Sequence, residues 1–148
     1  EITNNLEECM QSKLNPYISF EGNAREAMEF YKTVFGGQLD LNTFGEAGMS
    51  DHGVQPDQIM HAMLVADNGI TLMASDTATG MREYVAGTNI SVSLSGDNEA
   101  ELTGYYDKLV EGGKVDQPLT KAPWGDTFGM CIDKFGIFWM VNIAGPGA

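Results

Sequence analysis

Basic residues and long apolar runs are both scarce in this chain. Its 148 residues include eight Lys and Arg against 21 Asp and Glu, a formal net charge of −13. Binding to a nucleic-acid backbone depends on clustered Lys and Arg, so we expect no nucleic-acid partner. No apolar run approaches the roughly 18 residues of a membrane-spanning helix, and the first residues lack the basic-then-apolar order of a signal peptide. We therefore expect no membrane partner.

Cysteine is nearly absent as well. The two cysteines, Cys9 and Cys131, stand at no metal-ligand spacing. Apolar residues flank Cys131 on both sides, which is typical of a buried thiol rather than a catalytic one. A chain of this length needs no disulfide bonds to hold a core, and we expect a reducing, cytoplasmic location.

The length corresponds to one ordinary domain. Residues 1–13 are a polar, acidic leader, which we expect to be disordered or foreign to the native chain, with Met10 as a candidate native start. Residues 14–148 are predicted to form a single domain. Two modules compose it, at 14–76 and 88–144.

The first module is predicted to contain a strand, a helix and three further strands. Residues 17–20 alternate as a strand does directly after Pro16. The helix has Asn23 as its predicted N-cap and apolar residues at helical spacing until Gly36-Gly37. The further strands are expected at 38–44, 59–67 and 70–75.

Two connections in this module carry signals of their own. Asn68-Gly69 is the strongest short hairpin signal in the chain. Residues 45–57, rich in glycine and polar side chains, are predicted to be a long loop of the kind that often covers a binding site.

The second module repeats the first. A strand is predicted at 89–95, where Ile90, Val92 and Leu94 alternate with serines and are expected to face the helix. Asp97 or Asn98 caps the second helix, and a glycine pair ends it. Three more strands are expected at 114–119, 127–132 and 137–143.

The repeat is also visible as similar amino-acid sequences in the two modules. Gly69-Ile-Thr-Leu-Met73 returns as Gly136-Ile-Phe-Trp-Met140, 67 residues later, and Val34-Phe-Gly-Gly-Gln-Leu-Asp40 returns as Val110-Glu-Gly-Gly-Lys-Val-Asp116, 76 residues later. Two matches in the same order indicate an internal duplication.

Two such modules over residues 15–143 resemble the vicinal oxygen chelate superfamily, which includes glyoxalase I, extradiol dioxygenases and the bleomycin and fosfomycin resistance proteins. Five stretches are similar to its PhnB-like branch: Pro16–Phe20, Glu26–Tyr31 with Val34–Gly37, Met60–Ala62, Leu72–Asp76 and Trp139–Asn142. The resemblance implies an α+β fold in which two βαβββ modules form a curled eight-stranded mixed sheet around a cavity. It also implies a homodimer.

Enzymes of this superfamily hold a divalent metal with side chains from the first and fourth strands of each module. Aligned on this chain, those positions fall on Asn15 and Met73, and on Asn89 and Met140. Carbonyl oxygens and thioethers give Mg, Mn, Fe or Zn no anionic ligand. We therefore expect no metal and no other cofactor, although all four side chains should point into the concave face.

Candidate ligand-binding residues are those that should share this face or line the cavity: Asn15, Tyr17, Ser19, His61, Met73, Ser75, Asn89, Ser91, Phe128, Phe138, Met140 and Asn142. The serines have no base at fixed spacing, so they are either hydrogen-bonding groups of the cavity wall or part of a solvated face. His61 either binds an anion and moves a proton, or is a hydrogen-bonded histidine without acid–base function. His52 is expected at the surface.

Two functions remain open. The first is a metal-free protein that binds a small, partly apolar molecule in a cavity between the modules. The second is a lyase or dioxygenase-type enzyme with atypical metal ligands or acid–base chemistry at His61. A methyltransferase is not predicted, because no glycine-rich loop joins a strand to a following helix; Gly36-Gly37 follows a helix instead.

Overall fold

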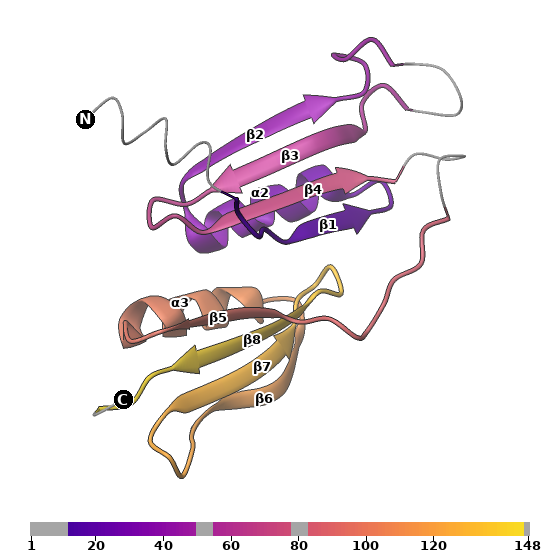
Figure 1. Ribbon diagram of the computed structural model, residues 1–148. Coiled ribbons are helices and arrows are strands. Elements are labelled where there is room, and N and C mark those ends of the chain that lie inside the picture. Colours follow the sequence, from indigo (N-terminus) through magenta and orange to yellow (C-terminus); the bar gives the residue numbers. More distant parts are fainter. Residues whose placement is uncertain (1–11, 50–54, 78–82, 147–148) are drawn as a thin grey trace, which may run out of the picture.

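The computed structural model describes residues 12–49, 55–77 and 83–146. Its two modules lie one above the other in Figure 1. His52 and the first eleven residues of the leader fall outside the described residues. Within those described, no helix is both long and apolar enough to cross a membrane.

The first module forms a four-stranded sheet with one helix. Its elements are β1 (Tyr17–Phe20), α2 (Ala24–Phe35), β2 (Gln38–Thr43), β3 (Ile59–Val65) and β4 (Thr71–Asp76). The strand order is β1-β4-β3-β2, with β1 parallel to β4 and the other pairs antiparallel.

The second module has the same topology. Its elements are β5 (Val92–Gly96), α3 (Glu99–Leu109), β6 (Lys114–Lys121), β7 (Thr127–Ile132) and β8 (Phe138–Ile143). The order β5-β8-β7-β6 repeats that of the first sheet, again with one parallel pair. The predicted α+β fold of two βαβββ modules is confirmed, with the eight strands divided between two four-stranded sheets.

One strand begins later than predicted. The strand expected at 89–95 starts at Val92, so Asn89 and Ser91 precede it. Among the strands of the described residues its only hydrogen-bonded neighbour is β8, and their register starts at Val92 opposite Trp139. In this register Ser91 lies opposite Phe138, the first residue of β8, and Asn89 lies before the start of that strand.

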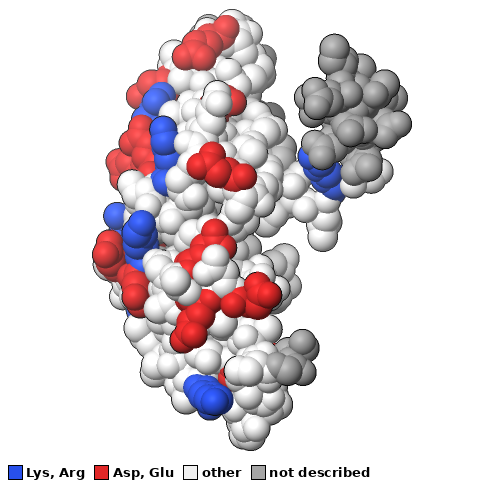
Figure 2. Space-filling model, turned by 90° about the vertical axis from the view of Figure 1, so that its left-hand side faces the viewer, with Lys and Arg blue, Asp and Glu red and all other residues white. Residues whose placement is uncertain are grey.

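Each helix covers one face of its own sheet, behind the strands in Figure 1. Along β4 and β8 every second residue is buried, including Leu72, Ala74, Trp139 and Val141, and these pack in one core with both helices. We call the opposite side of each sheet its open face. Figure 2 shows charged side chains gathered over the helix side, while the side of the open faces carries few.

The modules are joined through a buried carboxylate. Asp133, at the turn before β8, accepts hydrogen bonds from the Tyr31 hydroxyl of α2 at 2.6 Å and from Trp139 Nε1 at 2.8 Å. The backbone N–H groups of Phe135 and Ile137 donate to it at 2.8 and 3.1 Å. Burial foremost, and then the negative charge of Asp133, raise the pKa of Tyr31. Four donors thus satisfy a carboxylate that is only 3% exposed.

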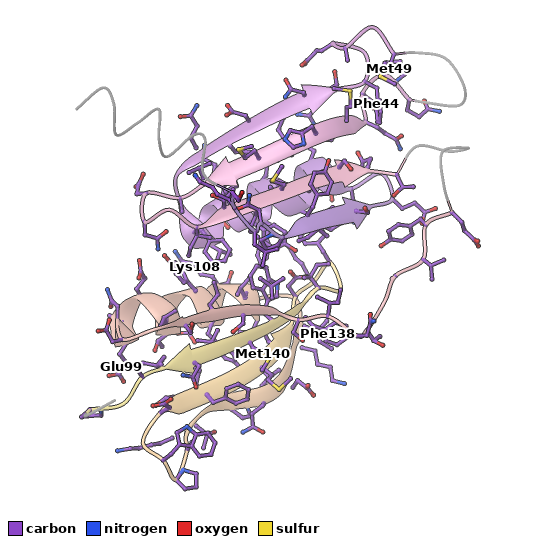
Figure 3. All side chains as sticks on the ribbon, viewed as in Figure 1. Phe44, Met49, Glu99, Lys108, Phe138 and Met140 are labelled. Atoms are coloured by element: carbon purple, nitrogen blue, oxygen red, sulfur yellow. The ribbon has the colours of Figure 1, made fainter. Side chains whose placement is uncertain are left out.

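The two helices also meet. Lys108 of α3 reaches the C-terminal end of α2, where its ammonium donates to the Thr33 carbonyl at 3.4 Å (Figure 3). Phe35 of α2 packs edge-on against Tyr105 of α3, with ring centroids 4.9 Å apart. The positive charge lies at the negative end of the α2 dipole, so this contact favours the observed arrangement.

The start of α2 is capped differently from the prediction. The Asn23 side chain makes no capping hydrogen bond. Instead Asp76, at the end of β4, accepts from the Ala24 N–H at 2.9 Å and from the Ile59 N–H at 2.8 Å. A buried carboxylate therefore ties together α2, β3 and β4, at a helix end that favours negative charge.

The repeated glycine pairs have a steric cause. A Cβ on Gly37 would lie 2.1 Å from the Val65 carbonyl oxygen, and one on Gly113 would lie 2.2 Å from that of Ile132. The second glycine of each pair passes directly against the next hairpin of its module. Only a residue without a side chain fits there.

Candidate functional site

The open faces carry two matching rows of side chains. The strand registers place Tyr17, Met73, Met63 and Asp40 side by side across the first sheet. Across the second sheet they place Ser93, Met140, Met130 and Gln117 side by side. Phe138 and Met140 stand on this face of β8 (Figure 3). Two thioethers lie at the centre of each row.

These registers correct the predicted correspondence between modules. Tyr17 lies opposite Met73, and Ser93 lies opposite Met140. Tyr17 and Ser93 are 76 residues apart, the spacing that also separates the two helix ends. Asn15 and Asn89 are therefore not counterparts, and both precede their strands. The prediction that these asparagines project from the first strands is wrong, because those strands begin at Tyr17 and Val92.

A cleft of about 930 Å³ lies between the modules, along β1 and β5. Half of the twelve candidate residues line it: Asn15, Tyr17, Ser19, Asn89, Ser91 and Phe138. The others lie on β3, β4, β7 and β8 outside its lining: His61, Met73, Ser75, Phe128, Met140 and Asn142.

The cleft is largely uncharged and partly apolar. Of the lining residues that the structure describes, Glu83 alone is charged. Leu14, Val85 and Ile90 also line it, with 99%, 75% and 77% of their surface exposed. Leu14 and Val85 were not among the predicted residues, since isolated apolar residues in loops give no signal. The prediction that Ile90 faces the helix is wrong, because Ile90 precedes β5 and is exposed.

A hydrogen-bonded pair stands beside the cleft. The Tyr17 hydroxyl lies 3.3 Å from His61 Nδ1, and the two ring centroids are 5.8 Å apart. Tyr17 is 48% exposed and lines the cleft, whereas His61 lies on β3 outside the lining of the cleft. The pair brings together two candidates that lie 44 residues apart in the sequence.

Asn142 is held by a neighbouring carboxylate. Its amide Nδ2 donates to Asp126 at 3.1 Å, and the Gly145 N–H donates to the same carboxylate at 2.9 Å. The hydrogen bond from Gly145, followed by that from Asn142, lowers the pKa of Asp126. Asp126, the residue that precedes β7, therefore fastens both β8 and the segment after it.

Cys131 is a core residue, 1% exposed. Burial, followed by the charge of Asp133, raises the pKa of its thiol to about 11. The thiolate needed for nucleophilic chemistry is accordingly disfavoured at neutral pH.

The side chains on the first and fourth strands do not fit a divalent metal. The residues paired there are Tyr17 with Met73 and Ser93 with Met140, which offer neutral hydroxyls and thioethers. Hard divalent ions prefer carboxylates, and zinc prefers imidazole and thiolate. Across the described part of the chain, no three His, Cys, Asp or Glu side chains are grouped so that they could hold a metal ion.

The fold and the sequence together define a family. Residues 13–141 match the model of the glyoxalase/bleomycin resistance protein/dioxygenase superfamily, and the chain belongs to this superfamily. The resemblance found in the sequence is thus confirmed.

Particular relatives are close in sequence or fold. Protein YjdN of Escherichia coli K12 is 29% identical over 140 residues, which cover 88% of this chain and 94% of that protein. The crystal structure of PA1353 from Pseudomonas aeruginosa is 38% identical, with a TM-score of 0.77, over 90% of this chain and 98% of that one. A Bacillus cereus PhnB protein, described as a putative 3-demethylubiquinone-9 3-methyltransferase, is 26% identical with a TM-score of 0.71, over 90% and 100%.

Proposed function

We propose that this protein binds a small, partly apolar molecule in the cleft between its modules, without a metal. The observation that carries the proposal is the cleft itself. Its volume of about 930 Å³ lies within the range of small-molecule sites, and its lining combines exposed apolar side chains with hydroxyl and amide groups.

The exposed apolar residues support an occupant. Leu14 precedes β1, whereas Val85 and Ile90 belong to the segment before β5, and all three line one cleft. Single exposed apolar residues need no explanation, but a cluster in a concave site marks a binding surface. Burying such side chains against a ligand removes apolar area from water, at about 25 cal/mol per Å².

Methyl transfer, which appears in the description of the B. cereus relative, is not part of the proposal. Gly36 and Gly37 follow α2, and Gly112 and Gly113 follow α3, so neither pair forms the loop between a strand and a helix that binds a nucleotide-like cofactor. Neither glycine pair therefore provides a binding site for such a cofactor.

A second candidate function is acid–base catalysis at His61. The 3.3 Å contact with Tyr17 favours it, because a fixed partner orients the imidazole. A glyoxalase assay distinguishes the two functions. Turnover by the wild type that is lost in His61→Gln would favour the enzyme.

The test of the first function uses protein purified without chelator or nickel resin. We expect elemental analysis to find no stoichiometric zinc, manganese or iron. The neutral dye N-phenyl-1-naphthylamine should bind with increased fluorescence, and its affinity should be the same before and after dialysis against EDTA. Stoichiometric metal, or dye binding that EDTA abolishes and metal restores, would contradict the proposal.

A further inference from the structure

The duplicated open faces differ at a few equivalent positions. Met63 of β3 pairs with Met73, and its counterpart Met130 of β7 pairs with Met140. The residue two positions earlier is His61 on β3 and Phe128 on β7. On β4 and β8, Thr71 and Phe138 occupy the matching positions. Tyr17 corresponds to Ser93. The open face of the first module thus carries the polar rings of Tyr17 and His61, and that of the second carries the apolar rings of Phe128 and Phe138.

We infer that the ligand has two chemically different ends, a flat apolar body and a hydroxyl group. The apolar body lies against Phe138 and Ile90 of the second module. The hydroxyl meets Tyr17 of the first module, whose orientation His61 fixes. This inference rests on the proposed function and specifies the class of ligand for the same cleft.

The cleft contains both kinds of contact at once. Tyr17, Ile90 and Phe138 all line it, so one molecule in it can touch residues of both modules. His61 lies outside the lining and acts through Tyr17, which makes it a positioning residue.

A ligand hydroxyl can hydrogen-bond to Tyr17 whichever way the hydrogen bond between Tyr17 and His61 runs. A tyrosine hydroxyl has one donor and two acceptor sites, and its contact with His61 uses one of them. Where Tyr17 donates to Nδ1, its oxygen still accepts from a ligand. Where Nδ1–H donates to Tyr17, the tyrosine proton is available to a ligand acceptor. A ligand hydroxyl, which both donates and accepts, satisfies both arrangements.

The charges favour a neutral ligand. Among the described residues of the lining Glu83 is the single charged one, and the whole chain carries a net charge of −13. An anion would leave water without a cationic partner among these described residues, which is costly.

The experiment compares 2-naphthol with naphthalene, each displacing N-phenyl-1-naphthylamine from the protein. The measured quantity is the ratio of the two dissociation constants. In Tyr17→Phe we expect the preference for 2-naphthol to fall about fivefold, the size of one net hydrogen bond, while naphthalene binds as before. His61→Phe, which copies the second module, should lower the ratio in the same way. His61→Gln, which keeps a hydrogen-bonding group, should retain part of the preference.

The control is Phe138→Ala, which should weaken both naphthalenes equally and leave the ratio unchanged. An unchanged ratio in Tyr17→Phe, with both compounds still bound, overturns this inference alone. Failure of the wild type to bind either the dye or the naphthalenes overturns the proposed function as well.

Discussion

Asp133 shows how one residue can fix the arrangement of two modules. The sequence marks it as the start of a turn before a strand, but nothing local indicates that Tyr31, 102 residues earlier, donates to it. Its two side-chain donors and two backbone donors replace the water that an exposed carboxylate would have.

Tyr31→Phe should therefore lower the free energy of unfolding by about 2 kcal/mol, because it removes a hydrogen bond to a charged acceptor while keeping the ring. Urea denaturation at pH 7 measures this. Tyr17→Phe is the matched control, since Tyr17 is half exposed, and it should change stability by less than about 0.5 kcal/mol. Equal effects of the two substitutions would contradict the role given to Asp133.

Cys131 gives a prediction about alkaline pH. Its pKa rises from an ordinary 9.0 to about 11 in the fold. A raised pKa means that the stabilising contribution is complete below pH 9 and is lost as the pH rises through 11. Unfolding free energies of the wild type should thus fall more steeply over this interval than those of Cys131→Ala. If the unfolding free energies of the two proteins fall in parallel with pH, the inference that the Cys131 thiol is buried and protonated is contradicted.

At the scale of elements, local patterns predict well and distant partners do not. The helices and the Asn68-Gly69 hairpin follow from periodicity and turn residues close in sequence, and the structure confirms them. The start of β5 depends on its pairing with β8, and the cap of α2 comes from Asp76, 52 residues after Ala24. Neither can be read from a short window of sequence.

The cap of α2 can be tested by a pair of substitutions. Asp76→Ala leaves the N–H groups of Ala24 and Ile59 buried without an acceptor and should cost about 3 kcal/mol. Asn23→Ala should cost well under about 1 kcal/mol, because the Asn23 side chain makes no cap. Chemical denaturation measures the free energy of unfolding of both variants. A larger loss in Asn23→Ala would contradict the role of Asp76 and favour Asn23 as the cap, as expected from the sequence.

For the candidate site, half of the residues chosen from the sequence line the cleft and half lie outside it. Alternation within strands identified Tyr17 and Ser19. The apolar contribution of Leu14 and Val85 could not be foreseen, since it depends on loops that the fold brings together.

At the scale of the whole molecule, the sheet edges differ. The outer strands carry charges, Asp40 on β2 and Lys114, Asp116 and Lys121 on β6, and charges discourage edge-to-edge pairing. The inner edge strands β1 and β5 carry none. These two strands border the cleft of the proposed ligand. We propose that the chain forms a homodimer, as the family resemblance implies, with the cleft left open to the ligand.

Light scattering at micromolar concentration should accordingly give twice the 16.0 kDa of one chain. A mass of one chain, unchanged on concentration, would contradict the dimer. It would leave ligand binding in the cleft to be tested separately.

The central claim is that the cleft between the modules is where a small, partly apolar molecule binds. The most direct measurement is the affinity for N-phenyl-1-naphthylamine of Ile90→Asp, with Val115→Asp as control. Ile90 lines the cleft, whereas Val115 is an exposed apolar residue of β6 outside it. We predict a loss of at least about tenfold in Ile90→Asp, since a charge would have to be desolvated against the dye, and no change in Val115→Asp. Equal affinities in the two variants would contradict the claim.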